Sequence, residues 1–280
     1  MKIKRLIQRN PVATYFLLAF AISWGGSAIA VGPKLLRGES IVLSDIWLIG
    51  GIMLNTVCLL GISLTYYLDG KDGLRKLFSS MGKWRIGARW YLALLIFPTL
   101  ILALLLVLTT LVSPAFRPNL FPLGILMGLL AGFLEEIGWM GFAFPRVKSR
   151  YTILAASIIL GVLHVLWHFA GDYLGASRAR GASWLPHFVA FCVAMVAMRV
   201  ILVWVYANTG SLLMAQLMHA SSTGFLGILV PMSLSPELDT LFYICYAVVL
   251  WGVAYILIVR YGKSLRGVEE KSGVYGYQSA

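Results

Sequence analysis

The chain has 280 residues, of which 60% are hydrophobic and only 12% are charged, and its mean hydropathy is +0.85. A water-soluble domain cannot bury so much apolar surface, so this composition excludes an ordinary soluble protein and predicts an all-α polytopic membrane protein. The net charge of +12 comes from basic residues that flank apolar segments. It therefore indicates attraction to anionic lipid in a bilayer and not a nucleic-acid partner.

A transmembrane helix needs about 20 apolar residues, and eight windows of this kind follow one another along the chain. We expect them to form a single integral domain over residues 1–280. The predicted spans are residues 12–32, 46–68, 90–112, 120–144, 152–171, 184–206, 211–231 and 241–259. The first of them also has features of a signal peptide, with a small-residue site at Ala28-Ile29-Ala30. Its apolar run is nearer to the length of a span, which favours an uncleaved helix.

Basic residues are concentrated on one side of these spans. If the N-terminus is cytoplasmic and the spans alternate in direction, the cytoplasmic segments hold most of the 23 Lys and Arg residues. The outer loops then hold Lys34, Arg37, Arg117, Arg178 and Arg180. This asymmetry follows the positive-inside rule and predicts that both termini are cytoplasmic.

The longest cytoplasmic connection, at residues 69–89, is basic and amphipathic. Its apolar residues are Leu74, Leu77, Phe78, Trp84 and Ile86. This pattern is typical of a segment that lies in the membrane interface, and we expect it on the inner leaflet. The alternative is a solvated loop.

Two adjacent glutamates, Glu135 and Glu136, are the only acids within any predicted span. They follow Gly124, Gly128 and Gly132, and these glycines share one helix face with Glu136 because they recur every four residues. Small residues at this interval allow a close helix crossing, so Glu136 should point at a neighbouring helix. A charge in hydrocarbon is expensive and usually functional, although the helix could instead end at the cytoplasmic interface.

The fifth span carries a polar stripe on one face, consisting of Ser157, Gly161, His164 and His168, and Asp172 follows directly after the span. Two histidines four residues apart can jointly bind a metal ion. In the alternative arrangement only His168 acts, and His164 packs against its neighbours.

The sixth span contains Arg199 and begins close to His187. An arginine in a span usually extends its charged end to the interface, and the alternative is a salt bridge to the glutamate pair. We expect His187 to be interfacial and not catalytic.

The seventh span places Gln216, His219 and Thr223 on one face. His219 could bind a metal or donate a proton, and Thr223 could donate a hydrogen bond. The alternative is simple hydrogen bonding between helices.

Carboxylates, imidazoles and hydroxyl groups inside a membrane can activate a water molecule for attack on a carbonyl. The same groups also serve proton-coupled transporters. The inventory of residues alone therefore leaves both functions open.

The order of the motifs resembles the CAAX protease and bacteriocin-processing (CPBP, or Abi) family of intramembrane proteases. The first motif matches at Glu135-Glu136-Ile137-Gly138-Trp139, and the second at Trp167-His168. The third matches at Asn208-Thr209-Gly210-Ser211 and His219-Ala220. The resemblance covers residues 120–225 and implies a catalytic core there.

By this resemblance, Glu135 would activate water with the help of His168, and Glu136 would support it. His219 would contribute to the oxyanion site. If a metal such as Zn²⁺ is used, His168 and His219 would bind it, and a metal-free mechanism is equally open. The substrate would be a membrane-bound or lipid-anchored protein or peptide, cleaved in the cell membrane.

Two residues depart from the family motifs. Met140 stands where the family has arginine, and Thr223 stands where it has asparagine. Arg199 could supply the missing charge from the sixth span. A catalytically inactive relative, acting in substrate binding or bacteriocin immunity, is therefore a second hypothesis.

Helix length sets a geometric condition on the predicted site. With a rise of about 1.5 Å per residue, Glu135 lies nearer the cytoplasmic end of its span than His168 does. The two meet only if the fourth span bends, for which Gly138 and Gly141 provide positions, or if the fifth span begins earlier.

Overall fold

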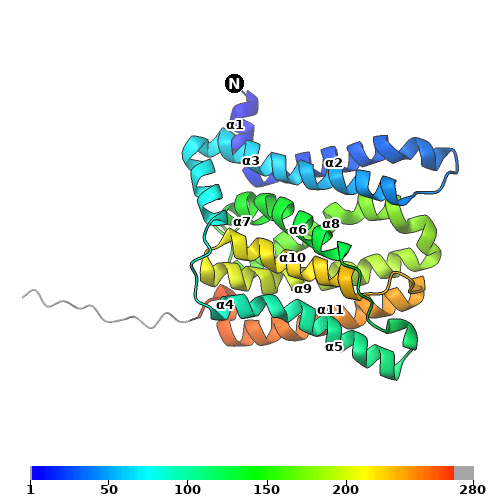
Figure 1. The fold of residues 1–280 in the computed structure, drawn as a ribbon. Helices are drawn as coiled ribbons and strands as arrows, with labels where there is room; N and C mark the ends of the chain where they lie inside the picture. The colour runs from blue at the N-terminus through cyan, green and yellow to red at the C-terminus, as the bar shows by residue number, and fades with distance from the viewer. Residues whose placement is uncertain (1, 268–280) are drawn as a thin grey trace, which may run out of the picture.

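The computed structural model describes residues 2–267, and within this range every regular element is a helix (Figure 1). The prediction of an all-α polytopic membrane protein is confirmed. The longer helices are α2 (Pro11–Leu36), α3 (Leu43–Met81), α5 (Ile96–Leu111), α6 (Leu123–Glu136), α8 (Ile153–Arg180), α9 (Trp184–Thr209), α10 (Leu212–Leu229) and α11 (Pro236–Tyr261). Shorter elements are α1 (Lys2–Arg9), α4 (Arg89–Leu92), a π-helix η3 (Ile137–Ala143) and α7 (Phe144–Val147).

Seven segments of the described chain are long and apolar enough to cross a membrane, whereas the sequence predicts eight. The difference lies in the segment Ile153–Thr209, which counts once although it contains both α8 and α9. The chain turns between them at Gly181, where φ is +53°, and α9 packs back along α8 (Figure 1). The predicted fifth and sixth spans are therefore two separate helices. Residues 268–280 lie outside the described residues, and the cytoplasmic location of both termini stays a prediction.

Helix α3 continues well beyond the predicted end of the second span. It is interrupted at Gly70, whose φ of 66° and ψ of −156° are not helical, and it then continues to Met81. A conformation with positive φ is accessible to glycine at little cost, so the chain can change direction there without unfolding either part. The solvated-loop alternative for this connection is therefore wrong as far as Met81. A location on the inner leaflet stays a prediction.

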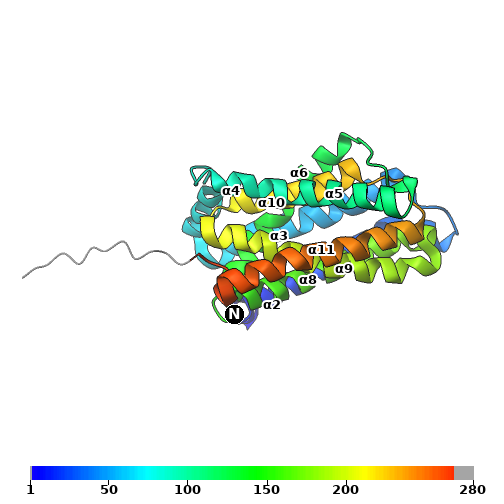
Figure 2. The ribbon, with the colours of Figure 1, turned by 90° about the horizontal axis from the view of Figure 1, so that it is seen from below.

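The helices are arranged in layers around α9 and α10. Helices α2 and α3 lie on one side, and α5 and α11 lie on the other, where Figure 2 shows them in front of the central helices. The middle of α9, residues 194–203, is buried on all faces, which explains why an arginine in this stretch cannot reach the interface.

The predicted glycine stripe of α6 packs directly on α10. A Cβ atom on Gly128 would lie 2.4 Å from the carbonyl oxygen of Ala220, and one on Gly132 would lie 2.4 Å from that of Gln216. Backbone atoms on both sides of the crossing leave no room for a side chain. The prediction that this face leads Glu136 to a neighbouring helix is confirmed.

The crossing can be tested by replacing Gly128 with alanine. We expect Gly128→Ala to lower the free energy of unfolding by about 1–3 kcal/mol, because the added methyl group meets backbone and forces the helices apart. Gly252→Ala in α11 is the matched control, since nothing lies within 4 Å of its Cβ position. Thermal unfolding of the purified protein in detergent measures both. Equal unfolding temperatures for the two variants would contradict the close crossing.

Candidate active site

Glu135 and Glu136 are buried at the junction between α6 and the π-helix η3. A π-helix has a wider turn than an α-helix and often occurs at functional sites, because it changes the direction in which side chains project. Gly138 lies within it, and a Cβ atom there would lie 2.0 Å from the hydroxyl oxygen of Tyr15. The expected bend near Gly138 and Gly141 thus takes the form of a widened helix packed against α2 and α3.

Glu136 is fully engaged by two cationic or polar partners. Nη1 of Arg199 donates to both carboxylate oxygens, at 2.8 and 2.7 Å, and Nδ1 of His219 lies 2.6 Å from Oε1. Arg199 has an exposed fraction of 0%. The expectation that Arg199 extends to the interface is therefore wrong, and the structure contains the alternative salt bridge to the glutamate pair.

Glu135 has a different environment, with one oxygen engaged and one free. Its Oε2 accepts a hydrogen bond from Nε1 of Trp139 at 3.1 Å and lies 2.7 Å from Nε2 of His164. Its Oε1 makes no hydrogen bond to any residue in the range 2–267. A carboxylate with a free lone pair can accept a proton, so Glu135 is the better candidate for a general base.

His164, and not His168, makes the direct contact with Glu135. Helix rise explains why, since Glu135 lies 12 residues before the end of α7 at Val147 and His164 lies 11 residues after the start of α8 at Ile153. The two are therefore at similar depth. His168 lies one turn farther along α8, with its Nε2 3.3 Å from Nε2 of His164. His164 therefore makes a polar contact as well as packing against its neighbours, and a role for His168 alone stays a prediction.

The position of the proton on His164 follows from its contact with Arg199. Nη2 of Arg199 lies 2.9 Å from Nδ1 of His164. Because a guanidinium group can only donate, Nδ1 must be the acceptor, and the proton of the neutral ring is then on Nε2. That N–H donates to Glu135.

This proton position bears on the metal hypothesis. Ligand atoms of Glu135, His164 and His168 lie within 4.8 Å of one another, the spacing of a three-ligand site. A histidine that binds metal through Nε2 normally donates from Nδ1 to an acceptor, but Nδ1 of His164 faces an arginine donor. The three residues in this arrangement do not fit a metal ion. Among residues 2–267, His219 is not part of a three-ligand group, so the pair His168 and His219 is not brought together as a ligand set.

The two residues that depart from the family motifs lie in different surroundings. Met140 is fully buried in η3, and Arg199 from α9 provides the charge that neutralises Glu136. Thr223 is half-buried one turn after His219, and its hydroxyl makes no hydrogen bond to the part of the chain that the structure describes. Gln216 donates to the carbonyl oxygen of Phe133 at 3.1 Å, which is the helix-to-helix bond that the alternative for this span predicts.

Two residues of the predicted polar set lie away from the carboxylates. Asp172 accepts a hydrogen bond from Nε1 of Trp184 at 2.6 Å. His187 is buried beside Tyr243, with Nδ1 3.6 Å from Asp239. Asp172 therefore extends the stripe of α8 in sequence but not the site in space. His187 is covered by α11 and lies away from the carboxylates, and its location at the membrane interface stays a prediction.

Sequence reasoning assigned no role to Trp139, although this residue lies within the first motif. Its position four residues after Glu135 places it one turn farther on the same side of the helix, and that spacing is the signal that could have identified it. Its ring also packs against Phe16, Trp167 and His164. The tryptophan thus supplies a donor to Glu135 and links it to the aromatic rings packed around the site.

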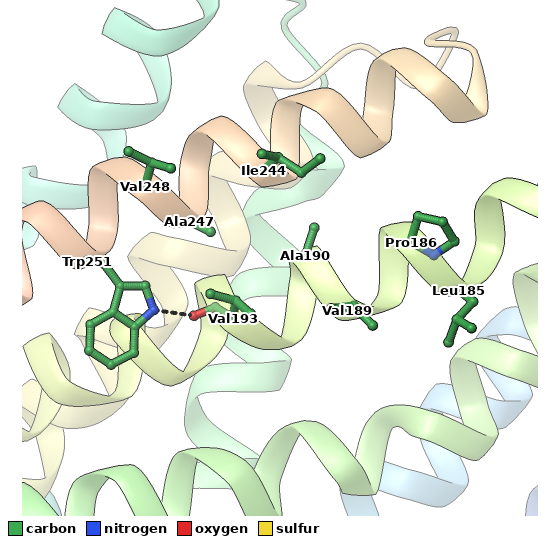
Figure 3. Close-up of a pocket in the computed structure, with 9 residues that line it drawn as sticks. All are labelled: Leu185, Pro186, Val189, Ala190, Val193, Ile244, Ala247, Val248 and Trp251. Carbon is green, nitrogen blue, oxygen red and sulfur yellow. Dashed lines mark hydrogen bonds between the residues drawn. The ribbon is translucent and has the colours of Figure 1, made fainter.

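A surface groove elsewhere on the described chain does not contain this site. It is an apolar groove of about 710 Å³ between α9 and α11, lined by residues such as Val189, Val193 and Val248 (Figure 3). The one polar contact drawn in it is from Nε1 of Trp251 to the carbonyl oxygen of Val193, at 3.0 Å. Such a surface has no group that could perform acid or base chemistry.

Comparison with known proteins agrees with the motifs. Residues 117–225 match the family described as type II CAAX prenyl endopeptidase, Rce1-like. This central segment is therefore similar to the CAAX prenyl endopeptidase family. A curated relative, CAAX prenyl protease 2 of Methanococcus maripaludis, is 33% identical over 112 residues. The match covers 38% of this chain and 39% of that relative. The resemblance indicated by the motifs is therefore confirmed, over a segment of about two fifths of the relative's length.

The different partners of the two glutamates predict different stability effects. Glu136→Ala leaves the buried charge of Arg199 without a partner, which should lower the free energy of unfolding by about 3–5 kcal/mol. Glu135→Ala removes only an acceptor for two uncharged donors and should cost about 1–3 kcal/mol. Thermal unfolding in detergent compares them directly. A larger loss for Glu135→Ala would contradict the assignment of the ion pair to Glu136.

Proposed function

We propose that the protein is an intramembrane endopeptidase that hydrolyses a peptide bond of a membrane-associated or lipid-anchored substrate. The observation that carries the proposal is the asymmetry of the glutamate pair. Glu136 is neutralised by Arg199, whereas Glu135 keeps a free oxygen beside two histidines. Two neighbouring carboxylates in such different surroundings suit the roles of a general base and a supporting group.

The proposed reaction uses a water molecule bound between Glu135 and His168. A ligand atom of Glu135 and one of His168 lie within 4.8 Å, a separation that one bridging water can span. Glu135 takes a proton from this water while the oxygen attacks the carbonyl carbon of the substrate. The resulting tetrahedral intermediate collapses when the C–N bond breaks, and Glu135 returns the proton to the leaving amine.

His219 is the proposed donor to the oxyanion. Its Nδ1 is committed to Glu136, which leaves Nε2 to face the reacting group. An imidazolium at this position donates from both nitrogens, and the neighbouring carboxylate of Glu136 stabilises that charge. Thr223, one turn away on α10, is the proposed second donor in place of the family's asparagine.

The proposed substrate class follows from the relatives. The matched family and the relative from M. maripaludis are named for CAAX prenyl cleavage. A prenylated peptide is anchored in the bilayer by its lipid, so its scissile bond can reach a site buried among helices. We place the protein in the cell membrane, with access to the site from the bilayer or the cytoplasmic face.

The proposal can be tested with Glu135→Gln, which keeps the size of the side chain and removes the base. We expect no detectable cleavage of a farnesylated CAAX peptide in liposomes, with an unchanged thermal unfolding profile. A comparison of protein termini in membranes that hold the wild-type or variant protein would identify natural substrates. Cleavage that survives Glu135→Gln would contradict the role of Glu135 as the base.

The departures at Met140 and Thr223 favour one second candidate, an inactive relative that binds lipid-anchored peptides. The same experiment separates the two. An inactive binder retains the farnesylated peptide without cleaving it, and Glu135→Gln leaves its affinity unchanged.

We further propose that the reaction is metal-free. A histidine that binds a metal through Nε2 normally donates a hydrogen bond from Nδ1. Nδ1 of His164 instead accepts a hydrogen bond from Arg199. Cleavage should persist after prolonged dialysis against a strong chelator, and elemental analysis of the purified protein should find far less than one zinc ion per chain. Loss of cleavage on chelation with recovery on addition of Zn²⁺ would contradict this.

A further inference from the structure

We infer that Arg199 is a positioning residue that fixes the proton of His164 on Nε2, in addition to neutralising Glu136. Arg199 would thereby set the hydrogen-bond direction at Glu135 without touching a substrate. The inference deepens the proposed function and rests on it for the catalytic consequence, but the position of the proton is a property of the folded protein alone.

The first support is the geometry of the guanidinium group. Nη1 contacts both oxygens of Glu136, and Nη2 contacts Nδ1 of His164 at 2.9 Å. A guanidinium is planar, so the direction of one nitrogen determines that of the other. The pairing with Glu136, the last residue of α6, therefore also sets the direction in which Nη2 of Arg199 donates to His164 on α8.

The second support is the space that the neighbouring helix provides. Gly161 lies one turn before His164 on α8, and a Cβ atom there would lie 3.3 Å from Cβ of Arg199. Such a distance is closer than most carbon contacts, so a side chain at this position would press on the arginine stem. The sequence thus leaves a gap beside His164 for an arginine from α9.

The third support is the chain of donors that ends at Glu135. Arg199 donates to Nδ1 of His164, so Nε2 carries the proton and donates to Oε2 of Glu135 at 2.7 Å. Trp139 donates to the same oxygen. Oε2 is thereby saturated with donors, and Oε1 is the oxygen left to act on water.

This arrangement also accounts for Met140. With methionine at the arginine position of the motif, the charge that balances Glu136 enters from α9. The relocated arginine reaches His164 as well, so that one side chain links α6, α8 and α9 around the site. The same contact prevents His164 from acting as a metal ligand, because a ligating histidine needs an acceptor at Nδ1.

The direct test is nuclear magnetic resonance of the wild-type protein in lipid nanodiscs with ¹⁵N-labelled histidine. The His164 signals are assigned by their loss in His164→Gln. We expect His164 to be neutral with its proton on Nε2 and a bare Nδ1. A proton on Nδ1, or on both nitrogens, in the folded wild-type protein would overturn the inference.

The second test uses Arg199→Lys, which keeps the positive charge beside Glu136. Lysine has one side-chain nitrogen in place of the two guanidinium nitrogens that contact Glu136 and His164. We expect the proton of His164 to become distributed over both nitrogens and the affinity for Zn²⁺ to rise about 10- to 100-fold. Cleavage of the farnesylated peptide should fall about 10²-fold or more in kcat, with little change in KM. Arg180→Lys is the matched control, since Arg180 pairs with Asp239 away from the site, at 2.7 Å.

The outcomes separate the two proposals. If no variant and no wild-type sample cleaves peptide, the proposed function fails, while the proton position and zinc affinity still decide the role of Arg199. If Arg199→Lys folds, keeps the wild-type proton position on His164 and gains no affinity for zinc, Arg199 serves stability alone and the inference is wrong. If Arg199→Lys does not fold, the wild-type spectrum decides.

Discussion

The buried ion pair between Arg199 and Glu136 is the interaction on which the rest of the site depends. Arg199 and Glu136 are both fully buried, each with an exposed fraction of 0%. Removal of two charges from water is costly unless each is paired and hydrogen-bonded. His164 accepts from Nη2 of Arg199 and His219 contacts Glu136, while Nε of Arg199 has no partner among the described residues. Charge balance and the geometry of the histidines are therefore determined together.

The close crossing of α6 and α10 at Gly128 and Gly132, together with the π-helix η3, positions this ion pair. Close packing of α6 on α10 brings His219 within hydrogen-bond distance of Glu136. The widened turn of η3 then allows the chain to pass Tyr15 and Gly61 while both glutamates stay directed inward. Backbone approach, and not side-chain size, is therefore what positions the acids, and this explains why bulkier residues at these glycines should disrupt the site.

The two adjacent carboxylates of the site have different hydrogen-bond partners. Glu136 contacts the charged Arg199 from α9 and His219 from α10. Glu135 accepts hydrogen bonds from uncharged donors, and these engage only one of its oxygens. The arginine that makes the difference comes from outside the family motif. A methionine in the motif is thus compatible with a balanced site when another helix supplies the charge at the same place.

The amino-acid sequence by itself determined the membrane class, the helical segments and a close crossing of α6 with some neighbouring helix, because apolar run length and helical periodicity are local properties. It also singled out Glu135, Glu136, His164, His168 and His219 as candidates. It did not decide whether Arg199 leaves the core or pairs with Glu136, which histidine contacts Glu135, or that α3 continues past Gly70. These depend on helix depth, rotation and contacts between residues far apart in the chain. Only the tertiary structure brings the α9 arginine, the α8 histidine and the α6 acids to one point, where the low-dielectric interior forces their charges to pair.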